Sequence, residues 1–121
     1  MKKGLVSLVA LFSVLLATIP AFANIEFQIA NNSGRTFHEI WVGPSSNTKW
    51  LDRDKVIRDG EPLRNGRYTT ITLSSVGREN VRLWDLRVDA SDGKKHEWHE
   101  IDLSGIYQIE IDRNWKANFQ R

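Results

Sequence analysis

Apolar and polar residues alternate with a period of two along most of the chain beyond residue 23. The first such run places Ile25, Phe27 and Ile29 on one face, which is typical of a half-buried strand. Further strands are predicted over 36–43, 68–74, 81–90, 96–103 and 106–113. Strands joined by short turns, with no amphipathic helix of useful length, predict an all-β fold: a small single-domain antiparallel β-sandwich of about six strands.

The same alternation predicts which aromatic residues face the core. Trp84 alternates with apolar neighbours in 81–90 and is expected inside. Trp41 and Phe37 are expected to share the face opposite to that of Ile40. A tryptophan outside the core can stack on a sugar ring or anchor a protein partner.

The segment 44–67 is rich in Ser, Asn, Asp, Gly and Arg, and only a short helical turn near 50–56 is predicted within it. Irregular segments of this length are uncommon in compact domains and are often functional. Candidate binding residues are therefore taken from this loop and from the out-of-phase tryptophans, namely Trp50, Asp52, Asp54, Trp41 and Trp98.

Residues 1–23 have the pattern of a secretory signal peptide. Lys2 and Lys3 precede an apolar run, and Ala21-Phe22-Ala23 provides an A-x-A cleavage site. The run is shorter than the ~20 residues of a spanning helix, so no stable membrane anchor is expected after cleavage. The prediction is a periplasmic or secreted β domain over 24–121.

Cleavage changes the charge of the protein. The leader carries two of the 17 basic residues and none of the 15 acidic residues, so the mature chain is formally neutral. A neutral chain gives no support to nucleic-acid binding. The chain has no cysteine, which excludes disulfides, thiol chemistry and a lipid-modified cysteine.

The stretch HEWHE at 96–100 resembles part of a zinc-protease motif, but His96 and His99 are three residues apart rather than four. On a strand they would point to opposite faces, with His99 on the side of Ile101 and Leu103. No metal is therefore predicted there. Nor does any serine lie in an elbow motif, so a hydrolase is a minor alternative.

Calcium binding is a second alternative function. If successive strands run up and down, the 44–67 loop and the turn at 91–93 lie at one end of the sandwich. Six acids could then gather as oxygen ligands for calcium: Asp52, Asp54, Asp59, Glu61, Asp89 and Asp92.

The motifs NNSGRTFHEIWVGPSSNTKWLDRD, DGEPLRNGRYTTITL, WDLRVDASDG and HEWHEIDL resemble a family of small exported bacterial β domains of unknown function. Some members carry the label argininosuccinate lyase, a name that belongs to a far longer, mainly helical enzyme and that we regard as a mislabel. Many relatives also have a cysteine pair, which this chain lacks. The resemblance implies a lone exported β domain and assigns no functional residues.

The leading hypothesis is thus a non-enzymatic, exported module of the bacterial envelope that binds a protein or another envelope component through the loop around Trp50. The alternative is a calcium- or glycan-binding sandwich that uses the acidic loop end. The identity of the partner and the oligomeric state stay open from the sequence.

Overall fold

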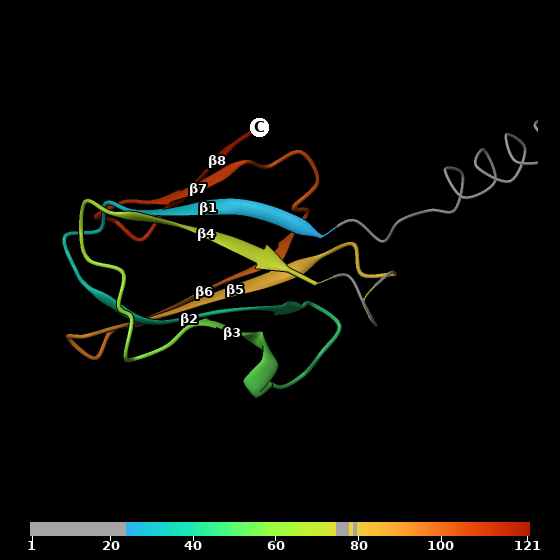
Figure 1. The fold of residues 1–121 in the computed structure, drawn as a ribbon, viewed down its shortest axis with the longest axis horizontal. Helices are drawn as coiled ribbons and strands as arrows, with labels where there is room; N and C mark the ends of the chain where they lie inside the picture. The colour runs from blue at the N-terminus through green and yellow to red at the C-terminus, as the bar shows by residue number, and fades with distance from the viewer. Residues whose placement is uncertain (1–23, 75–77, 79) are drawn as a thin grey trace, which may run out of the picture.

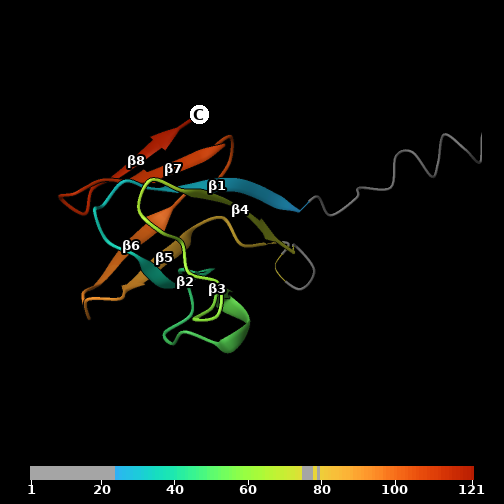
Figure 2. The same ribbon diagram turned by 60° about the vertical axis from the view of Figure 1, so that its left-hand side comes forward.

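The computed structural model describes residues 24–74, 78 and 80–121, so the predicted signal peptide lies outside the described residues. Two four-stranded sheets pack face to face (Figures 1 and 2). In chain order the elements are β1 (Ile25–Asn31), β2 (Phe37–Pro44), the 3-10 turn η1 (Asp52–Asp54), β3 (Lys55–Ile57), β4 (Tyr68–Leu73), β5 (Trp84–Ala90), β6 (Lys95–Ile101), β7 (Gln108–Ile111) and β8 (Ala117–Gln120). The predicted all-β sandwich is confirmed.

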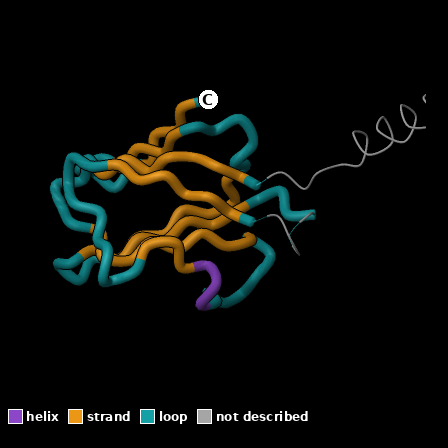
Figure 3. Tube along the Cα trace, in the orientation of Figure 1, coloured by secondary structure: helices purple, strands orange, loops and turns teal. Residues whose placement is uncertain are grey.

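One sheet has the strand order β4-β1-β7-β8 and the other β3-β2-β5-β6. Figure 3 shows strands in both layers and η1 as a single turn on the rim. The pairing of β1 with β7 is parallel, whereas the other five pairings are antiparallel. No helix among the described residues is long and apolar enough to cross a membrane.

The strand count of about six was too low, because the described residues form eight strands. β3 has three residues, too few for a period of two to be visible, and it lies inside the segment that was interpreted as a long loop. β8 follows a turn after β7.

The core lies between the two sheets. Trp84 is 2% exposed, which confirms its predicted place. Its neighbours in the buried cluster come from both sheets and the loops, and include Phe27, Ile29, Ile40, Val42, Leu63, Ile71, Leu73, Leu86, Val88, Ile109 and Ile111. Burial of this apolar surface is the main driving force for a domain without disulfides.

Two predicted faces were wrong because the strands are irregular at those points. Phe37 is fully buried, on the same side as Ile40, since the β2–β5 register shifts between Phe37 and Glu39. Ile101 is also buried, because Glu100 has a positive φ of 57° and the β5–β6 register shifts. Each irregularity adds a residue and reverses the alternation beyond it.

The two long sides of the sandwich are built differently. On one side lie the edge strands β6 and β8, and on the other β3 and β4 (Figure 2). At the β6/β8 side, Trp115 stacks on Phe37 at 5.9 Å and on His96 at 5.4 Å between ring centroids. Its carbonyl accepts a hydrogen bond of 3.2 Å from Trp98 Nε1. These four residues are the Trp115 cluster, which ties β6 to the turn before β8.

Candidate functional site

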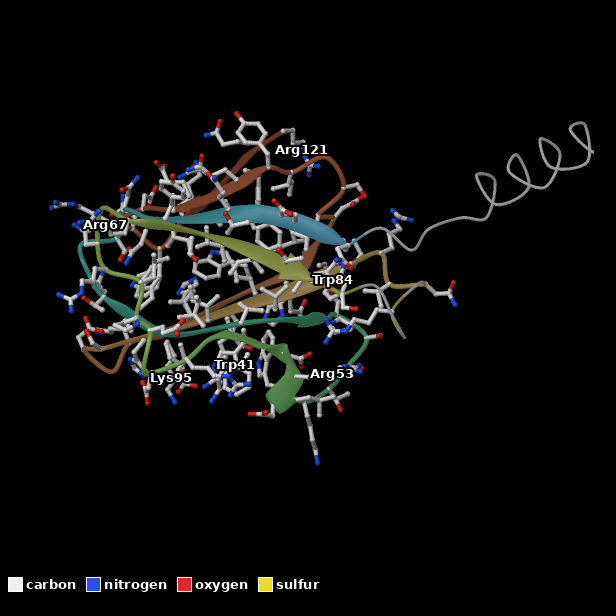
Figure 4. All side chains as sticks on the ribbon, viewed as in Figure 1. Trp41, Arg53, Arg67, Trp84, Lys95 and Arg121 are labelled. Carbon is white, nitrogen blue, oxygen red and sulfur yellow. The ribbon has the colours of Figure 1, made fainter. Side chains whose placement is uncertain are left out.

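Trp41 lies on the outer face of the β3-β2-β5-β6 sheet, away from the other sheet (Figure 4). Cross-strand register places Lys55 and Arg87 beside it. Lys55 Nζ is 4.6 Å and the Arg87 guanidinium carbon is 5.4 Å from the Trp41 ring centroid. Both cations are within the range of a cation–π interaction, so the indole is held on this face by its neighbours.

Carboxylates balance the two cations. Glu39 forms an ion pair with Lys55. Arg87 donates to both oxygens of Asp89, at 2.8 and 3.1 Å. The hydrogen bonds to Asp89 raise the pKa of Arg87, more than burial lowers it. The framework around Trp41 is therefore charged but internally paired.

Trp50 is brought to the same face by the loop that follows β2. Its ring packs edge-on against Trp41, with centroids 6.2 Å apart at 61°. Its indole Nε1 donates to Glu97 on β6 at 2.8 Å. At the start of the loop, Ser45 Oγ donates to Asp85 on β5 at 2.6 Å. We call this surface, centred on Trp41 and Trp50, the Trp41–Trp50 face.

A hollow of about 130 Å³ lies beside Trp50. Its walls come from the loop after β2 and from the outer face of β5 and β6, and they carry hydroxyl, amide, ammonium, carboxylate and imidazole groups. The lining residues are Asn47, Thr48, Lys49, Trp50, Asp85, Glu97 and His99.

Inside this hollow His99 Nδ1 lies 2.9 Å from Asp85 Oδ2. The hydrogen bond to Asp85 raises the pKa of His99, and it outweighs the opposing effect of burial. Burial would raise the pKa of Asp85, but hydrogen bonds from Ser45, His99 and the Glu100 amide together lower it. The pair is thus stabilised in its charged form.

Ser45, Asp85 and His99 do not have the geometry of a hydrolytic triad. In such a triad the imidazole stands between the hydroxyl and the carboxylate and takes the proton of the hydroxyl. Here the Asp85 carboxylate occupies the middle position and accepts from both groups. The Ser45 hydroxyl is therefore not activated by a base in this arrangement.

The structure brings together two of the five predicted binding residues, Trp41 and Trp50. Trp98 lies on the opposite side of its sheet, in the Trp115 cluster. Asp52 is exposed and pairs with Arg58 at 3.4 Å.

Asp54 has a structural position. It is 1% exposed, accepts a hydrogen bond from the Leu51 amide at 2.9 Å and pairs with Arg78 at 3.2 Å. A Cβ atom at Gly43 would lie 2.9 Å from the Asp54 carboxyl carbon. Because glycine has no Cβ atom, Gly43 leaves the space that the Asp54 carboxylate occupies.

The six acids proposed for calcium do not converge, which corrects the predicted cluster. β3 divides the loop, so Asp59 and Glu61 lie towards the Phe37 end of β2, and Asp52 and Asp54 towards the other. Four of the acids pair with an arginine: Asp52 with Arg58, Asp54 with Arg78, Asp89 with Arg87 and Asp92 with Arg35. Asp59 lies 3.9 Å from His38, and Glu61 is exposed. The carboxylates lack the common centre that calcium needs.

Among the described residues, one group with metal-ligating atoms close together is His38, Glu39 and Asp59. Glu39 already pairs with Lys55, so this group is not an open ligand set. His96 and His99 point to opposite faces, one to the Trp115 cluster and one to Asp85, as the alternation predicted.

Of the residues that line the hollow, sequence reasoning selected Trp50 and missed the other six: Asn47, Thr48, Lys49, Asp85, Glu97 and His99. In 96–103 the alternation placed Glu97 and His99 on the side of Ile101 and Leu103, and in 81–90 it placed Asp85 on the face opposite to Trp84 and Leu86. It did not indicate that the loop after β2 folds back across them. That contact joins Trp50 to Glu97, 47 residues away.

The comparisons with known proteins address the fold alone. No protein-family model and no curated protein matches the chain. An NMR structure of a protein from Eubacterium rectale is similar, with a TM-score of 0.51 and 17% identity over 80% of this chain and 86% of that chain. The fold and the comparison define a small all-β sandwich domain. The resemblance to the exported family stays a prediction.

Proposed function

We propose that the protein is an exported, non-enzymatic binding module of the bacterial envelope, and that it engages a partner protein through the Trp41–Trp50 face. The observation that carries the proposal is the fixed position of Trp50, held by Trp41 on one side and Glu97 on the other. A tryptophan that is ordered before binding loses little conformational entropy in the complex. Tryptophan and arginine are also the residues most enriched in interface hot spots.

The size of the hollow favours a protein over a small molecule. Its volume is about 130 Å³, whereas pockets for drug-sized ligands are roughly 300–1,000 Å³. A single side chain of a partner fits such a space. The paired charges around Trp41 then act as a polar rim that sets orientation.

A glycan is the second candidate, because the hollow combines an indole with two carboxylates and an amide, groups that bind sugar hydroxyls and ring faces. Digestion of the bound material distinguishes the two. Protease treatment of the eluted partner destroys a protein ligand and leaves a glycan intact.

The proposal is tested by capturing partners from envelope extracts with the tagged mature domain. Trp50→Ala should reduce specific capture by at least about tenfold, as expected for a hot-spot residue. Asp52→Ala is the matched control in the same loop, since Asp52 makes only an exposed ion pair. Equal capture by the two variants would reject the Trp41–Trp50 face as the binding surface.

Export is tested separately by mass spectrometry of the protein from intact cells. The proposal requires a mature chain that begins at Asn24 in the periplasmic or extracellular fraction. A full-length chain with Met1 in the cytoplasmic fraction would contradict it.

A further inference from the structure

β4 is a six-residue edge strand without the usual protection of an edge. Exposed edges are normally shortened, charged, bulged or interrupted by proline to prevent pairing with another chain. β6 carries Lys95, Glu97 and Glu100 and a register shift, and β3 and β8 have three and four residues. β4 has the sequence YTTITL and pairs with β1 in an unbroken register.

The hydrogen bonds around β1 establish which groups of β4 point outward. Asn31 N donates to Arg67 O, whereas Gln28 N donates to Tyr107 O on the other side of β1. Since the two directions alternate along a strand, Thr69, Ile71 and Leu73 bond to β1. The amides and carbonyls of Tyr68, Thr70 and Thr72 therefore face the open edge.

Two hollows flank this edge between β4 and β3. The first, about 360 Å³, is lined by Ile57, Leu63, Tyr68 and Thr69, among others. The second, about 330 Å³, lies against Val56, Thr72 and Leu73. An extended chain on β4 would place alternate side chains over Ile57 in the first hollow and Val56 in the second, which are partly exposed apolar residues.

The charge around the first hollow is positive. Arg64 and Arg67 line it together with Glu61, both arginines are exposed, and neither has an ion pair within the described part of the chain. Figure 4 shows Arg67 directed outward at the end of the sandwich where β4 begins. An acidic segment complements this charge.

We propose that the open edge of β4 is a second binding site, distinct from the Trp41–Trp50 face, and that it takes an extended, acidic segment of a partner protein by strand addition. The main chain of the segment pairs with Tyr68, Thr70 and Thr72. Its apolar side chains enter the hollow at Ile57 and Leu63, and its carboxylates pair with Arg64 and Arg67.

The test is an NMR titration of ¹⁵N-labelled mature protein with an eight-residue peptide of alternating valine and glutamate, and with its valine–lysine counterpart. Shift changes should be confined to β4 and the first hollow, and the acidic peptide should bind at least about tenfold more tightly, because its carboxylates form charge-assisted bonds. Equal affinities, or changes centred on Trp50, would overturn the proposal.

Two variants sharpen the result. Thr70→Pro removes an outward amide that β1 does not use, and proline is tolerated on the free side of an edge strand; binding should be lost while the rest of the spectrum is retained. Arg64→Glu with Arg67→Glu should reverse the peptide preference. The matched control is Lys95→Glu with Arg113→Glu at the β6/β8 side, which should change nothing. Dimerisation of the wild type through β4, with no peptide binding, would identify a second copy as the occupant and refute the acidic segment.

Discussion

The β6/β8 side and the β3/β4 side differ in how they are held and in what they leave open. Aromatic rings of the Trp115 cluster close the first, and its edge strands are charged or short. On the second, the 3-10 turn is fixed by a buried ion pair, Asp54–Arg78, and β4 presents an uncharged edge above two hollows. Apolar packing thus links the two sheets on one side of the sandwich, whereas the polar link on the other side leaves a strand edge available.

The largest expected loss of stability comes from breaking the Asp54–Arg78 ion pair on the β3/β4 side. Asp54→Ala leaves Arg78 buried without its partner and removes the acceptor of the Leu51 amide. The free energy of unfolding, measured by urea denaturation, should fall by about 3–5 kcal/mol. Asp52→Ala, two residues away and exposed, should change it by less than about 0.5 kcal/mol. Similar losses in both variants would show that the buried pair does not hold this side.

A substitution in the Trp115 cluster, on the β6/β8 side, should lower the free energy of unfolding somewhat less. Trp115→Ala removes the stacking on Phe37 and His96, but the ring is only partly buried. We expect a loss of about 2 kcal/mol in unfolding free energy and a weaker near-ultraviolet circular dichroism signal. Tyr107→Ala, at a residue 58% exposed, is the control. A loss no greater than that of the control would mean that the cluster does not close this side.

A smaller, pH-dependent effect is expected at the His99–Asp85 pair, which belongs to neither side. The raised pKa of His99 means that its stabilisation is complete below its ordinary pKa of about 6.5 and is lost as the pH rises through the folded value. The lowered pKa of Asp85 means that its stabilisation is present above about 3.9 and is lost as the pH falls through the folded value. The pair therefore contributes most between about pH 4 and 6.5.

His99→Gln should accordingly destabilise the protein at about pH 5.5 and have almost no effect at about pH 9. The loss of unfolding free energy at about pH 5.5 should exceed that at about pH 9 by less than about 1 kcal/mol, because solvent screens a pair whose imidazole is exposed. Chemical denaturation at the two pH values measures it. A larger loss at the higher pH would give the wrong sign for this linkage.

The smallest loss of stability is expected from a substitution on β4 itself. Tyr68 is 65% exposed, so Tyr68→Ala should change the unfolding free energy by less than about 0.5 kcal/mol. Thermal melting checks this. A marked loss of stability would show that the edge is covered by the protein's own side chains rather than open.

The sequence pattern predicted which residues face the core where the strands are regular, and it did not do so where the strands are irregular. Alternation predicted the sandwich, the core position of Trp84 and the separation of His96 from His99. It failed at Phe37 and Ile101, because a bulge or a positive φ adds a residue to one strand only, and no local pattern announces such an insertion. β3 was missed because three residues cannot display a period.

The site was predictable only in part, for a related reason. Trp50 could be selected because it lies in an unusually long irregular segment. Its neighbours Glu97 and Asp85 are distant in sequence, and their selection depends on the direction in which the loop folds. Asp54 illustrates the opposite error, since a loop carboxylate that was read as available for binding is buried as the cap and ion-pair partner of the fold.

The most direct test of the difference between the two sides is amide hydrogen exchange along β4, followed by NMR in a chain of residues 24–121 without added peptide. The amides of Thr69, Ile71 and Leu73 should exchange slowly because they bond to β1, and those of Tyr68, Thr70 and Thr72 should exchange rapidly because they face the open edge. Slow exchange at all six positions would contradict an open β4 edge.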